Sequence, residues 1–203
     1  MSQFIKRDKF IPYNLPDITE REVNAVADTL HSLWIAKGPR TVEFEQKFAG
    51  HVGAKHAVAM NSCTAALHVA LLSAGIGPGD EVITTPMTFA STASTILHTG
   101  ATPVFADIDY QTGCIDPDEI EKKITPKTRA IVPVHYSGQV CDLDRIYHIA
   151  DEHGLFVSED AAHALESRYK GRLIGCHPKG TVEYSFYATK NLTTGEGGML
   201  VGT

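Results

Sequence analysis

Residues 81–108 read EVITTPMTFASTASTILHTGATPVFADI. The β-rich run EVITT is followed by a segment of helical composition at residues 90–99, and then by a second apolar β-rich run at residues 102–108. Strand, helix and strand in this order form a βαβ unit, in which a right-handed crossover makes the two strands parallel. This stretch therefore predicts an α/β fold.

The same alternation continues on both sides of this unit. Further β-rich runs are expected at residues 56–60, 129–136, 155–160 and 181–187, and helices at residues 64–74, 116–124 and 142–153. Runs such as AIVPV are almost continuously apolar, which is typical of strands covered by helices on both faces. We therefore expect three layers, α/β/α, around a mostly parallel central sheet. Functional residues should then gather at the carboxyl ends of its strands.

Two helices are expected before the first strand. Thr19 and Glu22 have capping-box spacing, and the apolar residues that begin at Val23 recur at i, i+3, i+4 and i+7, which predicts one apolar helix face. A second segment, with apolar residues every four positions from Phe44, ends at Gly53. At the other end, the β-like run GGMLV begins just before Thr203, so we expect the chain to be the front part of a longer protein.

Composition excludes several classes of function. The 203 residues include 18 Lys and Arg against 24 Asp and Glu, a net charge of −6 without a basic run, which argues against a nucleic-acid partner. No stretch approaches the roughly 18 apolar residues of a membrane span, and the N-terminus MSQFIKRDKF has no signal-peptide core. The sequence therefore predicts a cytoplasmic protein without a membrane partner.

Metal and disulfide chemistry are not indicated. The four cysteines, at positions 63, 114, 141 and 176, form no CxxC pair, and the ten histidines form no HExxH motif. His135, His148 and His153 are expected to be surface or hydrogen-bonded residues. A dinucleotide site is not indicated either, because the glycines of GIGPGDE precede a strand and lack the GxGxxG spacing.

Polar residues follow the expected strands at four places. Residues 61–64, Asn-Ser-Cys-Thr, open a helix and could bind an anion, although Ser62 or Thr64 could equally serve only as a helix cap. Phe89 follows the run EVITT and could stack on a flat ligand or belong to the core.

The other two places carry ionisable groups. Asp160 ends the run LFVSED, close to His163, and could hold a functional charge or cap a helix formed by ALESRYK. Lys190 lies in a turn after the last complete strand, where it could be desolvated and nucleophilic or remain a solvated surface charge.

Taken together, the segments NSCTAALH, TPMTFASTAS, ATPVFADID, PVHYSGQ, EDAAHA and SFYATKNLTTGEGG resemble the DegT/DnrJ/EryC1/StrS family of nucleotide-sugar aminotransferases. The resemblance runs from about residue 11 to the end. It implies the large domain of fold-type I enzymes, which use pyridoxal 5'-phosphate (PLP). Residues 1–203 would comprise an N-terminal segment and this PLP-binding domain, with the smaller C-terminal domain missing.

The resemblance also implies roles for the polar residues. Lys190 looks like the lysine that forms a Schiff base with the cofactor, and Asp160 looks like the acid that pairs with its pyridine nitrogen. Thr64, Ala65 and Ser185 match positions around the phosphate. The residues expected to contact the cofactor are Ser62, Cys63, Thr64, Ala65, Phe89, Asp160, His163, Ser185, Lys190 and Asn191. The segment with Trp34, Lys37 and Gly38 resembles the sugar side of the site.

By this resemblance, the expected function is transfer of an amino group, from glutamate, to a nucleotide-linked keto-deoxysugar for surface polysaccharide or glycan synthesis, in a homodimer with shared active sites. Lysine at position 190 disfavours the family's dehydratase branch, which has histidine there. Two other readings stay open: different fold-type I chemistry, such as a sugar dehydratase or a cyclitol aminotransferase, and a truncated domain that serves as a non-catalytic interaction module.

Overall fold

The computed structural model describes residues 9–203 except 176 and 178. Most of the N-terminal run MSQFIKRDKF and the fourth cysteine, at position 176, therefore lie outside the described residues. The helices are α1 (Glu20–His31), α2 (Pro39–Val52), α3 (Cys63–Ser73), α4 (Ala90–His98), α5 (Pro117–Lys123) and α6 (Leu143–His153), with a 3-10 turn at Tyr136–Gly138. The strands are β1 (His56–Met60), β2 (Glu81–Thr84), β3 (Thr102–Phe105), β4 (Thr128–Val132), β5 (Phe156–Asp160), β6 (Arg168–Tyr169), β7 (Arg172–Leu173), β8 (Gly180–Ser185) and β9 (Gly198–Gly202).

A seven-stranded sheet of order β1-β9-β8-β5-β4-β2-β3 forms the centre of the molecule. Strands β8, β5, β4, β2 and β3 are parallel to one another, whereas β9 is antiparallel to both β1 and β8. The prediction of a mostly parallel sheet is confirmed. The run GGMLV is the one that forms the antiparallel strand.

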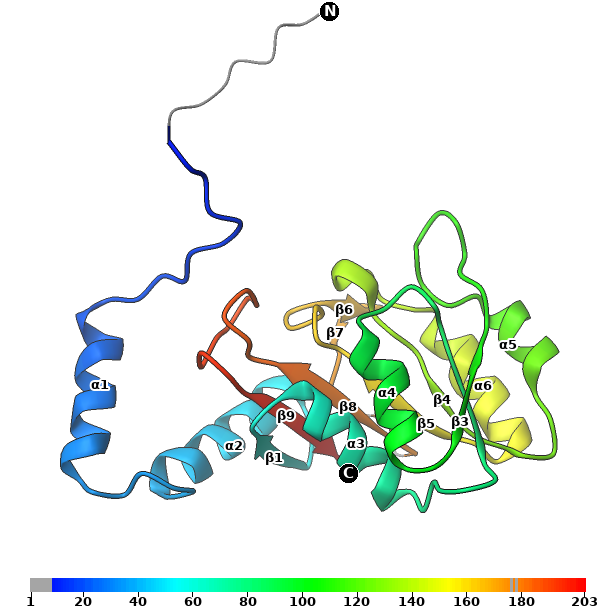
Figure 1. The fold of residues 1–203 in the computed structure, drawn as a ribbon, viewed down its shortest axis with the longest axis horizontal. Helices are drawn as coiled ribbons and strands as arrows, with labels where there is room; N and C mark the ends of the chain where they lie inside the picture. Colours follow the sequence, from blue (N-terminus) through cyan, green and yellow to red (C-terminus); the bar gives the residue numbers. More distant parts are fainter. Residues whose placement is uncertain (1–8, 176, 178) are drawn as a thin grey trace, which may run out of the picture.

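Side-chain alternation along the strands separates the two faces of the sheet. On β2, Val82 packs under α3 and α4, and its neighbour Ile83 packs under α5 and α6. On β4, Ala130 and Ile131 divide in the same way. A third cluster joins α2 to β8 and β9. The predicted three-layer α/β/α architecture is confirmed, and Figure 1 shows the helices on both sides of the sheet.

The N-terminal helix forms as expected but buries nothing. Thr19 and Glu22 make the reciprocal capping box, yet α1 contains no buried residue. Val26 and Leu30, on its predicted apolar face, are 61% and 57% exposed. Figure 1 shows α1 standing apart from the sheet. Helix α2 is anchored by its apolar face and ends at Gly53, which adopts φ +76°, as the sequence predicts.

Two expectations about local structure are wrong. The segment ALESRYK forms a turn and the first strand of the β6–β7 hairpin rather than a helix, so Asp160 caps no helix there. Glu166 and Lys170 have φ values of +70° and +48°, which interrupt a helix. The runs expected at 102–108 and 129–136 also leave the sheet early, at Phe105 and Val132. Their last residues form loops joined only by isolated bridges.

Within the described residues, no helix is both long and apolar enough to cross a membrane.

Candidate active site

The predicted polar residues meet in one cavity at the carboxyl edge of the sheet. The cavity has a volume of about 480 Å³ and is bounded by the start of α3 and by the segments that follow β2, β4, β5 and β8. Eight of the ten residues expected to contact a cofactor line it: Ser62, Cys63, Thr64, Phe89, Asp160, His163, Ser185 and Lys190. Lys190 and Asp160, thirty positions apart in the sequence, therefore face the same space.

The amino end of α3 forms one wall of the cavity. The hydroxyl oxygen of Ser62 accepts a hydrogen bond from the Ala65 N–H at 3.1 Å, so the capping interpretation of Ser62 is confirmed. This bond occupies the Ala65 N–H, one of the groups expected around the phosphate. Thr64 lies in the first helical turn and lines the cavity. The first N–H groups of a helix and its dipole favour an anion at this position.

A glycine brings the helix this close to the sheet. A Cβ on Gly198, in β9, would lie 2.4 Å from the carbonyl carbon of Ser62 and 2.5 Å from the backbone nitrogen of Cys63. Any other residue would push the start of α3 away from β9. Ser185, at the end of β8, lines the same wall. The position of the predicted anion site at the start of α3 thus depends on the close backbone contact between β9 and α3.

Lys190 is a partly buried amine in the turn that follows β8. Its backbone N–H donates to Tyr187 O at 2.9 Å, which holds the predicted turn. Burial lowers the pKa of Lys190, and the nearby charges of Asp160 and Cys63 only partly oppose this effect. A lowered pKa increases the neutral, nucleophilic fraction of the amine. Lys190 lines the cavity and is only partly exposed, so the structure does not place it as a fully solvated surface charge.

Asp160 is the last residue of β5 and is only 4% exposed. Its Oδ1 accepts from the Ala162 N–H at 3.1 Å, and its Oδ2 accepts from the Thr92 hydroxyl at 2.8 Å. A buried carboxylate held in this way keeps a fixed direction. It presents a negative charge to the cavity from the side formed by β5 and α4.

An exposed ring and a histidine complete the predicted set. Phe89 is 78% exposed, so the interpretation of this residue as core is wrong, and its ring is available to pack on a flat ligand. Burial lowers the pKa of His163, and the charge of Lys190 lowers it further. His163 is therefore a neutral hydrogen-bonding group near neutral pH.

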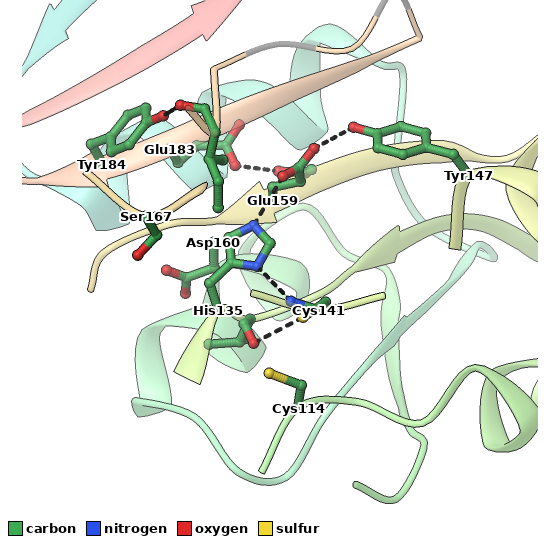
Figure 2. A network of polar contacts seen from close by, with 12 residues as sticks. Cys114, His135, Cys141, Tyr147, Glu159, Asp160, Ser167, Glu183 and Tyr184 are labelled. Atoms are coloured by element: carbon green, nitrogen blue, oxygen red, sulfur yellow. Dashed lines mark hydrogen bonds and ion pairs between the residues drawn. The ribbon is translucent and has the colours of Figure 1, made fainter. Parts of the chain in front are cut away.

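A buried polar network supports the strand ends behind the cavity. Figure 2 shows His135 between Glu159 and Cys141. The Cys141 N–H donates to Nδ1 of His135 at 3.3 Å, so the proton on Nε2 donates to Glu159 at 2.9 Å. The Tyr147 hydroxyl donates to the other oxygen of Glu159. The backbone N–H of His135 also donates to the backbone oxygen of Asp160 at 3.0 Å, which connects this network to the site. His135 is thus buried and hydrogen-bonded, as expected.

The structure places five of the predicted residues elsewhere. Asn191 and Ala65 do not line the cavity; Asn191 donates to Leu165 O at 3.4 Å. Trp34 and Gly38 line a separate hollow between α1 and α2. Lys37 pairs with Glu45 at 2.9 Å. The sugar-side assignment of this segment stays a prediction.

Sequence reasoning missed several residues of the site. Thr88 and Thr92 lie four positions apart, so that they share one face of the chain entering α4, a spacing visible in TPMTFASTAS. Glu183 has no such signal. Its fully buried carboxyl lies beside Asp160 across β5 and β8 and accepts from the Ser158 hydroxyl at 2.8 Å. Burial raises its pKa well above the ordinary value.

Comparisons with known proteins agree with this arrangement. Residues 16–203 match the DegT/DnrJ/EryC1/StrS aminotransferase family. The spore coat polysaccharide biosynthesis protein SpsC of Bacillus subtilis is 62% identical over 195 residues, which cover 96% of this chain and 50% of that protein. The putative sugar aminotransferase Spr1654 of Streptococcus pneumoniae, in its PMP-form, superposes with a TM-score of 0.91 at 40% identity, covering 95% of this chain and 52% of that one.

DesI, solved in the presence of its TDP-sugar product, superposes with a TM-score of 0.84 at 41% identity, over 93% of this chain and 48% of that chain. The chain thus spans about half the length of the relatives it matches.

Proposed function

The chain belongs to the DegT/DnrJ/EryC1/StrS aminotransferase family, and from this premise we propose that it is the cofactor-binding part of a PLP-dependent sugar aminotransferase. The observation that carries the proposal is the shared cavity: the amine of Lys190 and the carboxylate of Asp160 line one space that begins at the amino end of α3. The structural relative Spr1654 has been solved in a PLP-form as well as a PMP-form.

The residues present fit PLP in charge and shape. A phosphate requires an anion site, which the start of α3 supplies together with the hydroxyls of Thr64 and Ser185. An aldehyde requires an unprotonated amine, which the lowered pKa of Lys190 favours. Asp160 would pair with a pyridine nitrogen, and the exposed ring of Phe89 would pack on the face of the cofactor ring.

When bound, PLP supplies the electron sink that stabilises negative charge at the carbon losing its proton. The residues of the chain bind it and move protons. Lys190 Nζ would hold the cofactor through its aldehyde and would move the proton at the reacting carbon. Asp160 would pair with the ring nitrogen, and its negative charge would favour the protonated form of that nitrogen. His163 offers a neutral hydrogen bond inside the cavity.

The substrate class rests on the relatives. We propose a nucleotide-linked keto-deoxysugar as amino acceptor and glutamate as donor, for polysaccharide or glycan synthesis. SpsC is named for spore coat polysaccharide biosynthesis, and DesI was solved with a TDP-sugar product. Product analysis with keto sugars and keto cyclitols as acceptors separates this function from a cyclitol aminotransferase or a dehydratase.

We also propose a homodimer with shared sites, to be tested by light scattering.

The assignment of Lys190 is tested by reductive labelling of the complete gene product. Incubation with PLP and borohydride should attach the cofactor to Lys190, as read by peptide mass spectrometry. Lys190→Ala should lose both the label and the long-wavelength absorbance. Lys127→Ala is the matched control, because Lys127 is exposed and precedes β4 at the opposite edge of the sheet. Labelling of another lysine would contradict the assignment of Lys190. A colourless wild-type protein would falsify the proposal in favour of a non-catalytic domain.

A further inference from the structure

Two threonine hydroxyls lie in series behind Asp160. Thr92, in α4, donates its hydroxyl proton to Asp160 Oδ2 at 2.8 Å, and its side chain is fully buried. The hydroxyl of Thr88 lies 2.7 Å from that of Thr92. Each of the three groups belongs to the wall of the cavity or lies directly behind it, since Thr88 and Asp160 both line the cavity.

The direction of the hydrogen bond between Thr88 and Thr92 follows from the number of protons that each group can donate. A threonine hydroxyl has one proton, and a carboxylate has none to give. Because the proton of Thr92 goes to Asp160, Thr88 must donate to Thr92. The Oδ1 atom of Asp160 is held separately by the Ala162 N–H at 3.1 Å. Both oxygens of Asp160 are therefore fixed, one by its own loop and the other by a different element of the fold.

We propose that Thr92 is a positioning residue that directs Asp160 toward the pyridine nitrogen of the cofactor. This inference rests on the proposed function. Asp160 is at the end of a strand, where its loop alone fixes only one oxygen. The bond from α4 fixes the second oxygen and so the plane of the carboxylate. Thr88 strengthens that bond, because a hydroxyl that accepts a hydrogen bond becomes a better donor. Phe89 follows Thr88 directly, so the same segment places the aromatic ring.

The test compares PLP with 1-deaza-PLP, the analogue in which a C–H group replaces the ring nitrogen. The dissociation constant of each is measured by absorbance titration of the complete gene product and its variants. Thr92→Val keeps the β-branched shape and removes the hydroxyl, so its dissociation constant for PLP should rise about tenfold. Thr92→Ser keeps the hydroxyl and should stay close to wild type. For 1-deaza-PLP, Thr92→Val and wild type should bind equally.

Thr95→Val is the matched control. Thr95 is on the same helix and equally buried, but its hydroxyl donates to the backbone oxygen of Thr92 at 3.1 Å and does not reach Asp160. This variant should affect PLP and 1-deaza-PLP alike. If Thr92→Val also weakens both ligands equally, Thr92 only ties α4 to β5 and the inference is wrong. If the wild-type protein binds neither ligand, the proposed function itself has failed.

A second variant keeps the inference testable if Thr92→Val does not fold, as judged by circular dichroism. Thr88 is only partly buried, so Thr88→Val should fold. It removes the donor to Thr92 and should weaken PLP binding by about threefold while leaving 1-deaza-PLP binding unchanged. An equal loss of affinity for both ligands, or no loss for either, would contradict the role proposed for the hydrogen bonds from Thr88 through Thr92 to Asp160.

Discussion

Three buried acids near the cavity have different environments because of where strand alternation sends them. Asp160 and Glu159 are adjacent in β5 and leave it on opposite faces. Glu159 meets His135 and Tyr147 on the α6 side, whereas Asp160 meets Thr92 on the α4 side. Glu183 lies beside Asp160 in the neighbouring strand. Although they are adjacent in the sequence, Glu159 therefore supports the strand ends and Asp160 lines the cavity.

Glu183 offers a prediction about pH. Burial raises its pKa well above the ordinary value of 4.5, so the folded protein binds a proton that the unfolded chain has lost. The contribution of this proton is fully present below about pH 4.5 and is lost as the pH rises from there to the raised pKa. The loss in the free energy of unfolding is at most about 1.4 kcal/mol for each pH unit in this window.

Glu183→Gln copies the protonated acid, so it should match wild type near pH 4.5 and become more stable than wild type as the pH rises. Urea unfolding at pH 5, 7 and 9 measures the difference. The Ser158 hydroxyl, which donates to Glu183 at 2.8 Å, can donate to the glutamine oxygen in the same way. Parallel stability curves for the two proteins would mean that Glu183 is ionised in the folded state.

At the scale of elements, the contact between β9 and α3 sets the position of the proposed anion site. Gly198→Ala places a methyl group against the backbone of Ser62 and Cys63, at 2.4 and 2.5 Å, and backbone cannot rotate away. We expect a loss of about 1–3 kcal/mol in the free energy of unfolding and weaker PLP binding, because the start of α3 must shift. Denaturant unfolding and absorbance titration measure the two effects.

Gly202 provides the control on the same strand. A Cβ there meets only the Cγ2 atom of Thr181, at an ordinary 3.7 Å. Gly202→Ala should therefore change stability and PLP binding little. If both alanine variants bind PLP as tightly as the wild type does, the position of α3 is not set by Gly198.

The elements were predictable where the sequence signal is local. Apolar runs and caps predict most strands and helices, and the capping box of Thr19 and Glu22 forms as expected. The hairpin β6–β7 was not predicted, because ALESRYK has helical composition. Its two-residue turn consists of Lys170 and Gly171, with φ values of +48° and +81°, and lysine is not a typical residue for this conformation. The exposure of α1 was not predictable either, since an apolar face in the sequence does not say what covers it.

At the scale of the whole molecule, the site was predictable to the extent that topology creates it. Parallel strands bring Asp160 and Lys190 to one edge of the sheet, and a sequence pattern of strands is enough to predict this. The partners behind them were not predictable. Thr92 reaches Asp160 across 68 positions, and β8 joins β5 only in the folded sheet. Contacts of this kind depend on exact register, which periodicity does not provide.

The cavity is lined by segments that follow four strands of the central sheet, so cofactor binding should stabilise the sheet and the helices packed on it. A ligand that binds only the folded state at 100 times its dissociation constant adds about 2.7 kcal/mol. For a chain of this size, that corresponds to a rise in Tm of roughly 5–10 °C. PLP should give this rise in wild type, as measured by differential scanning calorimetry.

The rise in Tm given by related ligands shows how much each group of the cavity contributes to binding. Pyridoxine 5'-phosphate keeps the phosphate and ring but has no aldehyde for Lys190, so its shift in wild type should be smaller than that of PLP. In Lys190→Ala, the two ligands should give equal, small shifts, because only contacts such as those of Thr64, Ser185 and Asp160 remain. Pyridoxal without its phosphate should shift wild type least, since the start of α3 then has no anion to hold. A full PLP shift in Lys190→Ala would show that the cavity binds this ligand without the amine.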